Sequence, residues 1–203
     1  LQPGHYMIVD RRRQLQQRRY WEFSYPDRDA EPDRRSLSEI LKQLDQQLTQ
    51  SVLLHQRSDV PYGAFLSGGL DSTTVVAYMC ALNNRPVKTF SIGFNEKSYD
   101  ETPEAELVAQ HYNTEHYNIR LDVPAFDELD RILDFWDQPN ADYSCLPTYL
   151  VSAFAKKRVK VVLTGDGGDE VFAGYPTHLM PRLVPWYQRL PRALRKSLLE
   201  PLA

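Results

Sequence analysis

The sequence has few cysteines, no long apolar run and no surplus of positive charge, and each shortage excludes a class of protein. Cys80 and Cys145 are the only cysteines in 203 residues and form no CxxC pair, which argues against a disulfide framework or a cysteine zinc site and fits a reducing compartment. The longest apolar run, Val75 to Leu82, is far shorter than the roughly 20 residues that cross a bilayer. A net charge of −3 argues against a dedicated nucleic-acid binder. We therefore expect a cytoplasmic protein without membrane or nucleic-acid partners.

A glycine pair stands where an apolar strand turns into a helix, in the string Ser67-Gly68-Gly69-Leu70-Asp71-Ser72. Adjacent glycines let backbone N–H groups approach an anion, and the following helix points its unpaired N–H groups at the same place. The Walker A lysine and the GxGxxG spacing are both missing, so neither of those nucleotide-binding loops is present. A carboxylate facing phosphates needs a cation between them, so Asp71 predicts Mg²⁺. The segment is therefore interpreted as a phosphate-binding loop.

A second glycine-rich loop follows the apolar strand at Val159 to Leu163. It reads Thr164-Gly165-Asp166-Gly167-Gly168-Asp169-Glu170 and combines three glycines with three carboxylates. Such a set suits a hard divalent cation, and Asp169 would share Mg²⁺ with Asp71 if the two strand ends are neighbours. The alternative is a solvated acidic turn that caps a helix. An EF-hand is excluded, because its ladder of ligands is missing.

Strands and helices alternate from Val60 onward, which predicts an α/β fold with a parallel sheet. The expected strands are Gly63–Leu66, Val87–Phe94, Glu115–Ile119 and Lys160–Thr164. The expected helices are Ser72–Leu82, Pro103–Tyr112, Pro124–Phe135, Thr148–Lys157 and a short one from Gly168. In such sheets ligands bind at the carboxyl ends of the strands, where both glycine-rich loops fall.

Ahead of this region the pattern differs, and it predicts three segments. Residues 1–25 read as two short strands, His5–Asp10 and Gln17–Phe23, and residues 26–35 as a linker rich in Pro, Asp and Arg. The main domain, residues 36–203, then opens with a helix to His55, for which Ser36 and Glu39 form a capping-box pattern.

Taken together, the two loops resemble the ATP-pyrophosphatase, or PP-loop, superfamily, and within it the synthetase domain of glutamine-dependent asparagine synthetases. The resemblance covers roughly Leu37 to Tyr175. It rests on Ser67–Ser72, on Phe90–Phe94 (FSIGF), on Asp142–Tyr149, and on Gly165–Tyr175 with its GDGGDE and FAGY strings. It implies an adenine-nucleotide alpha-hydrolase-like fold, with a parallel sheet covered by helices on both faces.

The resemblance also implies an activity, that of a C–N bond-forming ligase. A substrate carboxylate, aspartate in the namesake enzymes, attacks the α-phosphate of ATP; pyrophosphate leaves, and ammonia displaces AMP to give asparagine. By resemblance, Ser67, Gly68, Gly69, Asp71 and Ser72 hold pyrophosphate and Mg²⁺, with Asp169 as the second metal ligand. Leu66, Ile92, Thr164 and Gly165 line the nucleotide site. Asp166 occupies an acidic position near the acyl-adenylate, so that Asp71, Asp166 and Asp169 are the catalytic carboxylates.

In this family a glutaminase domain supplies the ammonia, and residues 1 to about 23 resemble its last two strands. Its nucleophile is an N-terminal cysteine, which neither Cys80 nor Cys145 can be. The family also places a lysine beyond Tyr175 on the phosphates. We assign no residue here to that position, because Lys196 lies in a stretch without an alignment. These gaps leave the activity of the isolated chain open. The sequence does not determine the oligomeric state, for which a homodimer is one alternative.

Two other hypotheses remain. The first is a related synthetase that acts on another carboxylate: a β-lactam synthetase, a peptide cyclase, or an amidotransferase for sugars or peptides. The second is a nucleotide-binding module without catalysis. The first loop contacts only ATP and therefore cannot distinguish these enzymes by their substrates. The substrate loop Asp142–Pro147 and the C-terminal region of the synthetase domain could.

Overall fold

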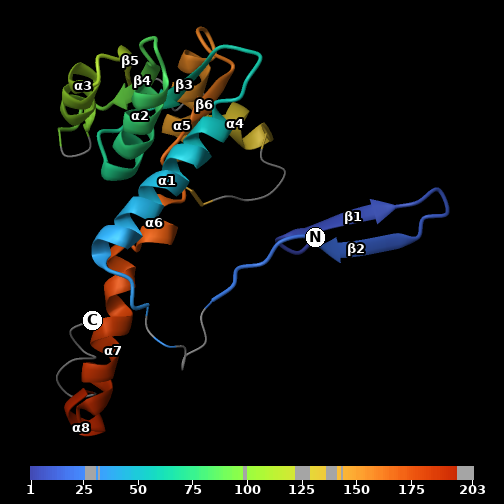
Figure 1. Cartoon of the computed structure of the whole chain (residues 1–203), viewed down its shortest axis with the longest axis vertical. Coiled ribbons are helices and arrows are strands. Elements are labelled where there is room, and N and C mark those ends of the chain that lie inside the picture. Colours follow the sequence, from blue (N-terminus) through green and yellow to red (C-terminus); the bar gives the residue numbers. More distant parts are fainter. Residues whose placement is uncertain are drawn as a thin grey trace. The chain divides into compact units, whose positions relative to one another are not determined.

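The computed structural model describes residues 1–25, 31, 33–97, 100–121, 129–135, 141–142 and 144–195. It divides into two compact units, Leu1–Lys42 and Gln43–Ala203, which are described separately (Figure 1).

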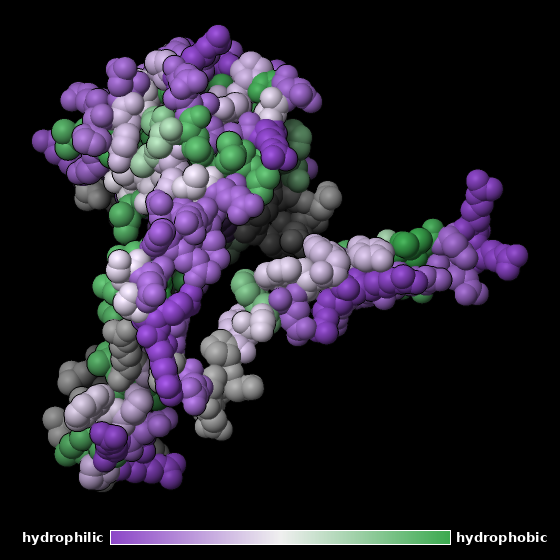
Figure 2. All heavy atoms as spheres, in the orientation of Figure 1, coloured by the Kyte–Doolittle hydropathy of each residue, from purple (hydrophilic) through white to green (hydrophobic). Residues whose placement is uncertain are grey.

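The first unit contains an antiparallel hairpin of β1 (His5–Val9) and β2 (Leu15–Arg19). The predicted pair of strands is present, but β2 starts and ends earlier than expected. It starts earlier because the turn is tight: the Asp10 carboxylate accepts the backbone N–H groups of Arg12 and Gln14. Both strands are exposed, and Figure 2 shows green and purple side chains next to one another along the hairpin. Residues 26–30 and 32 of the predicted linker lie outside the described residues.

Helix α1 (Leu37–His55) begins in the first unit and continues into the second. The predicted capping box is confirmed. The Ser36 N–H donates to Glu39 Oε2 at 2.8 Å, and the Glu39 N–H donates to Ser36 Oγ at 3.3 Å. These bonds satisfy backbone donors that the first turn of a helix otherwise leaves unpaired. Hydrogen bonds from Ser36 also lower the pKa of Glu39.

The second unit contains a four-stranded parallel sheet in the order β5-β4-β3-β6. Its strands are β3 (Tyr62–Phe65), β4 (Lys88–Gly93), β5 (Glu115–Arg120) and β6 (Val161–Leu163). Ala64, on β3, pairs with Thr89 of β4 on one side and with Leu163 of β6 on the other. The predicted α/β class is confirmed. Strand β3 lies between β4, which contains most of the FSIGF string, and β6, which precedes the second glycine-rich loop (Figure 1).

The helices of this unit follow the strands along the chain. They are α2 (Leu70–Leu82), α3 (Thr102–His111), α4 (Leu129–Phe135), α5 (Cys145–Ala155), α6 (Gly168–Phe172), a 3₁₀ turn η2 (Pro176–Leu179), α7 (Met180–Arg189) and α8 (Arg192–Leu194). Residues 124–128 of the predicted fourth helix and residues 196–203 lie outside the described part. Within the described ranges, no helix is long and apolar enough to cross a membrane.

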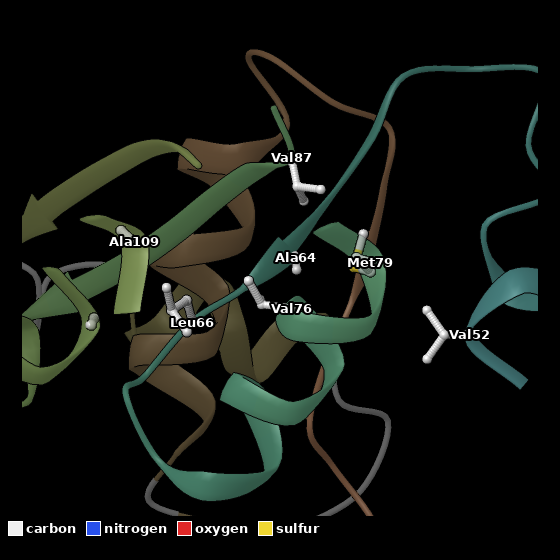
Figure 3. Close-up of a cluster of buried hydrophobic side chains, with 8 residues drawn as sticks. Val52, Ala64, Leu66, Val76, Met79, Val87 and Ala109 are labelled. Atoms are coloured by element: carbon white, nitrogen blue, oxygen red, sulfur yellow. The ribbon is translucent and has the colours of Figure 1, made fainter. Parts of the chain in front are cut away.

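One face of the sheet packs on α1, α2 and α3. Leu66 and Ala64 are almost fully buried there against Val76 and Met79 of α2, with Val52 of α1 in the same cluster (Figure 3). Successive side chains of a strand point to opposite faces, so Phe65 faces away from its neighbours Ala64 and Leu66.

Helix α5 covers the other face. Phe90 is fully buried in a cluster with Val151 and Ala155 of α5. Its ring stacks on Tyr117 of β5 and meets Phe154 edge-on, at centroid distances of 5.5 and 6.2 Å. Helices on both faces hold the strands rigidly, and the carboxyl ends of β3, β4 and β6 therefore form a fixed platform for the loops that follow them.

Candidate active site

The two glycine-rich loops lie side by side. The first follows β3 and the second follows β6, and β3 and β6 are paired in parallel. The sequence placed Asp71 and Asp169 at one site only if the two strand ends were neighbours, and the structure shows that they are. Carboxyl ends of parallel strands meet at one edge of a sheet, the usual position of ligands in open α/β folds.

The first loop is held in shape by its own hydroxyl groups. Ser67 Oγ and Ser72 Oγ are 2.9 Å apart, and the Ser72 hydroxyl also donates to the Gly69 carbonyl at 3.2 Å. Gly68 has a φ of +86°, and a Cβ there would lie 2.5 Å from the Cβ of Glu104 in α3. Glycine is required at this position both by its backbone conformation and by the close approach of α3.

Helix α2 starts at Leu70, two residues earlier than predicted, with Gly69 at its N-cap. Asp71 therefore belongs to the first turn of the helix, where a carboxylate is favoured by the helix dipole. The early start also directs the first N–H groups of α2 to the loop, which is the arrangement that binds anions.

Two glycines of the second loop allow it to touch the first. A Cβ on Gly165 would lie 2.6 Å from the Ser72 backbone nitrogen, and one on Gly168 only 2.3 Å from Asp71 Cγ. The Asp71 carboxylate thus occupies the space that a side chain at position 168 would fill. Asp169, the next residue, lies in the first turn of α6.

Asp71 and Asp169 are half-buried carboxylates, and the described residues that line the space around them include no lysine or arginine. No hydrogen bond or ion pair from the described residues reaches either side chain, and no group of three or more metal-ligating side chains is found in that part of the chain. Unpaired carboxylates at one place favour a bound cation. Two carboxylates with substrate phosphates are the usual ligand set of Mg²⁺, so the residues fit the ion that the sequence predicted.

A crevice of about 810 Å³ opens between the two loops, and we call it the loop crevice. Eight of the predicted site residues line it: Ser67, Gly69, Asp71, Ser72, Thr164, Gly165, Asp166 and Asp169. Its described lining contains no lysine or arginine. Lys196 lies outside the described residues. Gly68 shapes the loop but is not part of this lining.

Leu66 and Ile92 lie in a neighbouring space of about 330 Å³, the strand crevice, at the ends of β3 and β4. Ser67 lines both the strand crevice and the loop crevice, so the two spaces adjoin. The lining is mainly apolar, with Phe90, Phe94 and Val151, and Glu101 is its one ionisable side chain among the described residues. An apolar slot beside a phosphate-binding loop is suited to a nucleoside.

A third space of about 680 Å³, the helix crevice, lies along α4 and α5. Its described lining is Ile132, Phe135, Asp142, Ser144, Cys145, Thr148, Tyr149, Ser152 and Asp166. Hydrogen bonds from Ser144 lower the pKa of Asp142, so this carboxylate favours its charged form. Thr148 and Asp166 line the helix crevice and the loop crevice alike.

Several lining residues lie in strings that carry the resemblance but received no role of their own from the sequence. Thr148 was expected at the start of a helix and within the Asp142–Tyr149 string, whereas α5 begins at Cys145 and carries Thr148 in its first turn. Glu170 and Tyr175 line the loop crevice, and the Tyr175 hydroxyl donates to Glu170 Oε1 at 2.8 Å. This bond lowers the pKa of Glu170 and raises that of Tyr175. The FAGY string marked Tyr175, but nothing in its spacing indicated this partner.

Comparison with known proteins gives one family. A family model described as asparagine synthase matches residues 43–203. A putative glutamine-hydrolysing asparagine synthetase 2 of Methanocaldococcus jannaschii is 45% identical over 91% of this chain and 35% of its own length. Asparagine synthetase 1 of Bacillus subtilis is 36% identical over 79% of this chain and 25% of its own length. The chain thus spans about a third or less of these relatives.

Among solved structures, a glutamine-dependent NAD⁺ synthetase from Acinetobacter baumannii in complex with ADP matches 92% of this chain and 38% of its own. The TM-score is 0.46 and the sequences are 18% identical.

Proposed function

This chain belongs to the asparagine synthase family, as the two glycine-rich loops indicated, and on that premise we propose that it is the ATP-using part of an amide-forming synthetase. A substrate carboxylate oxygen attacks the α-phosphorus of ATP, the bond to the β-phosphate breaks, and pyrophosphate leaves. Ammonia then attacks the carbonyl carbon of the acyl-adenylate, AMP leaves with the C–O bond electrons, and a proton is lost as the amide forms. The observation that carries the proposal is the contact of the two loops, with Asp71 lying directly above Gly168.

ATP is proposed to lie across the strand crevice and the loop crevice. The nucleoside fits the apolar lining of Leu66 and Ile92, and the phosphates fit the loop of Ser67 to Ser72. Thr164 and Gly165 line the loop crevice from the loop that follows β6. No protein nucleophile is needed, because the residues act by positioning the reactants and stabilising charge.

Asp71 and Asp169 are proposed to hold Mg²⁺ together with the phosphates. The ion supplies charge neutralisation for pyrophosphate as it leaves. The protein contributes two half-buried carboxylates held by the start of α2 and the start of α6. Gly165 and Gly168 allow these helix starts to approach one another.

The acceptor carboxylate is proposed to enter from the helix crevice. This space meets the loop crevice at Thr148 and Asp166, so a carboxylate can reach the α-phosphorus while the rest of the acceptor stays beside α5. Asp142 and Asp166 are acidic and suit an ammonium group, which favours an amino acid such as aspartate. At about 680 Å³ the space also accommodates a larger acceptor, which supports a related synthetase for another carboxylate as the second candidate.

The partner is proposed to be a glutaminase domain that supplies ammonia, with β1 and β2 as strands of that domain and residues 36–203 as the synthetase domain. The names of the relatives, which are glutamine-hydrolysing synthetases, support this assignment. A cytoplasmic location belongs to the same proposal. Both cysteines are free thiols, which supports a reducing compartment. Burial raises the pKa of Cys80, which makes its thiol less reactive.

The experiment is pyrophosphate release by the full-length protein with ATP, Mg²⁺, ammonium chloride and single carboxylates. We expect release with aspartate, formation of AMP, and a loss of at least a hundredfold in Asp71→Asn. Asp59→Asn is the matched control, because Asp59 precedes β3 and lies at the end of the sheet away from the loops. Release of ADP and phosphate in place of AMP and pyrophosphate would overturn the adenylation scheme.

A further inference from the structure

Thr148 and Asp166 stand at the opening between the loop crevice and the helix crevice. They are the two described residues that line both spaces. Thr148 comes from the first turn of α5, and Asp166 from the loop after β6. If ATP occupies one space and the acceptor the other, the reacting atoms meet between these two side chains.

The hydroxyl of Thr148 has no hydrogen-bond partner among the residues that the structure describes. Threonine in a helix often donates its hydroxyl to the carbonyl four residues earlier, as Thr74 of α2 does to Leu70 at 2.8 Å. In α5 the Thr148 N–H donates to the Ser144 carbonyl at 3.0 Å, but no hydrogen bond within the described part of the chain involves the Thr148 hydroxyl. Thr148 is exposed and lines the opening, so its donor is available to a ligand.

Asp166 cannot take the same role. An ionised carboxylate only accepts hydrogen bonds, and it repels another carboxylate. One of its oxygens already accepts the Thr164 hydroxyl at 2.9 Å. A carboxylate that enters between the two side chains therefore needs a donor on the opposite side, and Thr148 supplies one.

Building on the proposed function, we propose that Thr148 is a catalytic residue whose hydroxyl donates a hydrogen bond to the acceptor carboxylate at this opening. The bond engages one oxygen of the carboxylate and leaves the other free to attack the α-phosphorus. No proton is transferred in this step, since the hydroxyl remains a donor throughout. Thr148 therefore acts by orienting the nucleophile, and its contribution is specific to the acceptor.

The test compares Thr148→Val with Thr148→Ser in the full-length protein, with L-aspartate, ATP, Mg²⁺ and ammonium chloride. Valine keeps the volume and removes the donor, whereas serine keeps the donor. We expect Thr148→Val to lower kcat/KM for aspartate by about tenfold to a hundredfold, the range for a lost hydrogen bond to a charged group. Thr148→Ser should recover to within about threefold of wild type.

Two further measurements make the result specific. The Kd for ATP, measured by calorimetry without aspartate, should change less than about twofold in Thr148→Val, because the lost bond is to the acceptor. Thr74→Val is the matched control, since its hydroxyl is already bonded within α2. It should leave kcat/KM for aspartate within about twofold.

The inference and the function on which it rests fail in different ways. If wild type releases pyrophosphate with aspartate and Thr148→Val does the same at an equal kcat/KM, the role of Thr148 is wrong and the proposed function stands. A loss that serine does not restore, or an equal loss of ATP affinity, also overturns the role of Thr148. If wild type releases no pyrophosphate with aspartate, the inference falls together with the aspartate reaction.

Discussion

The absence of a side chain at Gly168 leaves room for the Asp71 carboxylate, and the substitution Gly168→Ala, which adds one methyl group, tests this role. An alanine Cβ at position 168 would lie 2.3 Å from Asp71 Cγ and 2.5 and 2.7 Å from its two oxygens. Ordinary contact starts at 3.4 Å, so the carboxylate has to retreat by about 1 Å, the difference between 3.4 and 2.3 Å. The backbone itself accepts alanine, because Gly168 is not among the described glycines with a positive φ.

The expected loss follows from this displacement. A misplacement of about 1 Å in a catalytic arrangement can cost on the order of a hundredfold in rate. We therefore expect Gly168→Ala to lower kcat/KM for pyrophosphate release by about a hundredfold. The free energy of unfolding should change by less than about 1 kcal/mol, because alanine favours the helical conformation that α6 already has. Steady-state kinetics and urea unfolding measure the two quantities.

Gly167→Ala is the matched control in the same loop. A Cβ on Gly167 meets nothing within 4 Å, but its φ of +91° strains any other residue. This variant should lose about 1–3 kcal/mol of stability and less than about tenfold in kcat/KM. Wild-type kcat/KM in Gly168→Ala, or equal losses of activity in both variants, would refute the link between Gly168 and the Asp71 carboxylate.

Three further predictions concern stability. Phe90→Ala should lower the free energy of unfolding by about 3–5 kcal/mol in urea, because Phe90 is fully buried between Tyr117 and Phe154; a loss below about 1.5 kcal/mol contradicts this packing. Ser36→Ala should cost about 1 kcal/mol through the lost capping box of α1, and no change in the urea midpoint would contradict it. Burial lowers the pKa of His116 in the folded protein, and the smaller effect of the Glu106 charge, which raises this pKa, does not offset it. As the pH falls below about 6.5, the unfolded chain therefore binds a proton at His116 before the folded protein does, and the free energy of unfolding decreases. His116→Gln should reduce the loss between pH 7.5 and 5.5, and an equal loss in both proteins would show that other groups cause it.

Local patterns predicted most of the elements. The alternation of apolar strands and helices gave the α/β class, and the Ser36–Glu39 spacing gave the start of α1. The ends of the elements were less accurate, because they depend on partners far away in the sequence. Strand β2 ends at Arg19, since beyond it the N–H groups of Tyr20 and Trp21 both donate to the Gly4 carbonyl.

The residue types of the candidate site were also visible in the sequence. Glycines with carboxylates after two apolar strands indicate phosphate and a divalent cation, whatever the order of the strands. Eight predicted residues line one crevice because β3 and β6, which lead into the two loops, are neighbours. Thr148 lay in the Asp142–Tyr149 string but received no role, because a threonine in the first turn of a helix has no distinctive pattern.

The sequence by itself determined the type of the strands and helices that surround the sheet, the position of the two glycine-rich loops and the family, because these depend on local composition and spacing. Only the tertiary structure decided that β3 and β6 are neighbours, that the Asp71 carboxylate lies above Gly168, and that two crevices meet at Thr148. The physical reason is that pairing between distant strands and packing of α5 across the sheet are set by the whole buried core, which no single segment encodes.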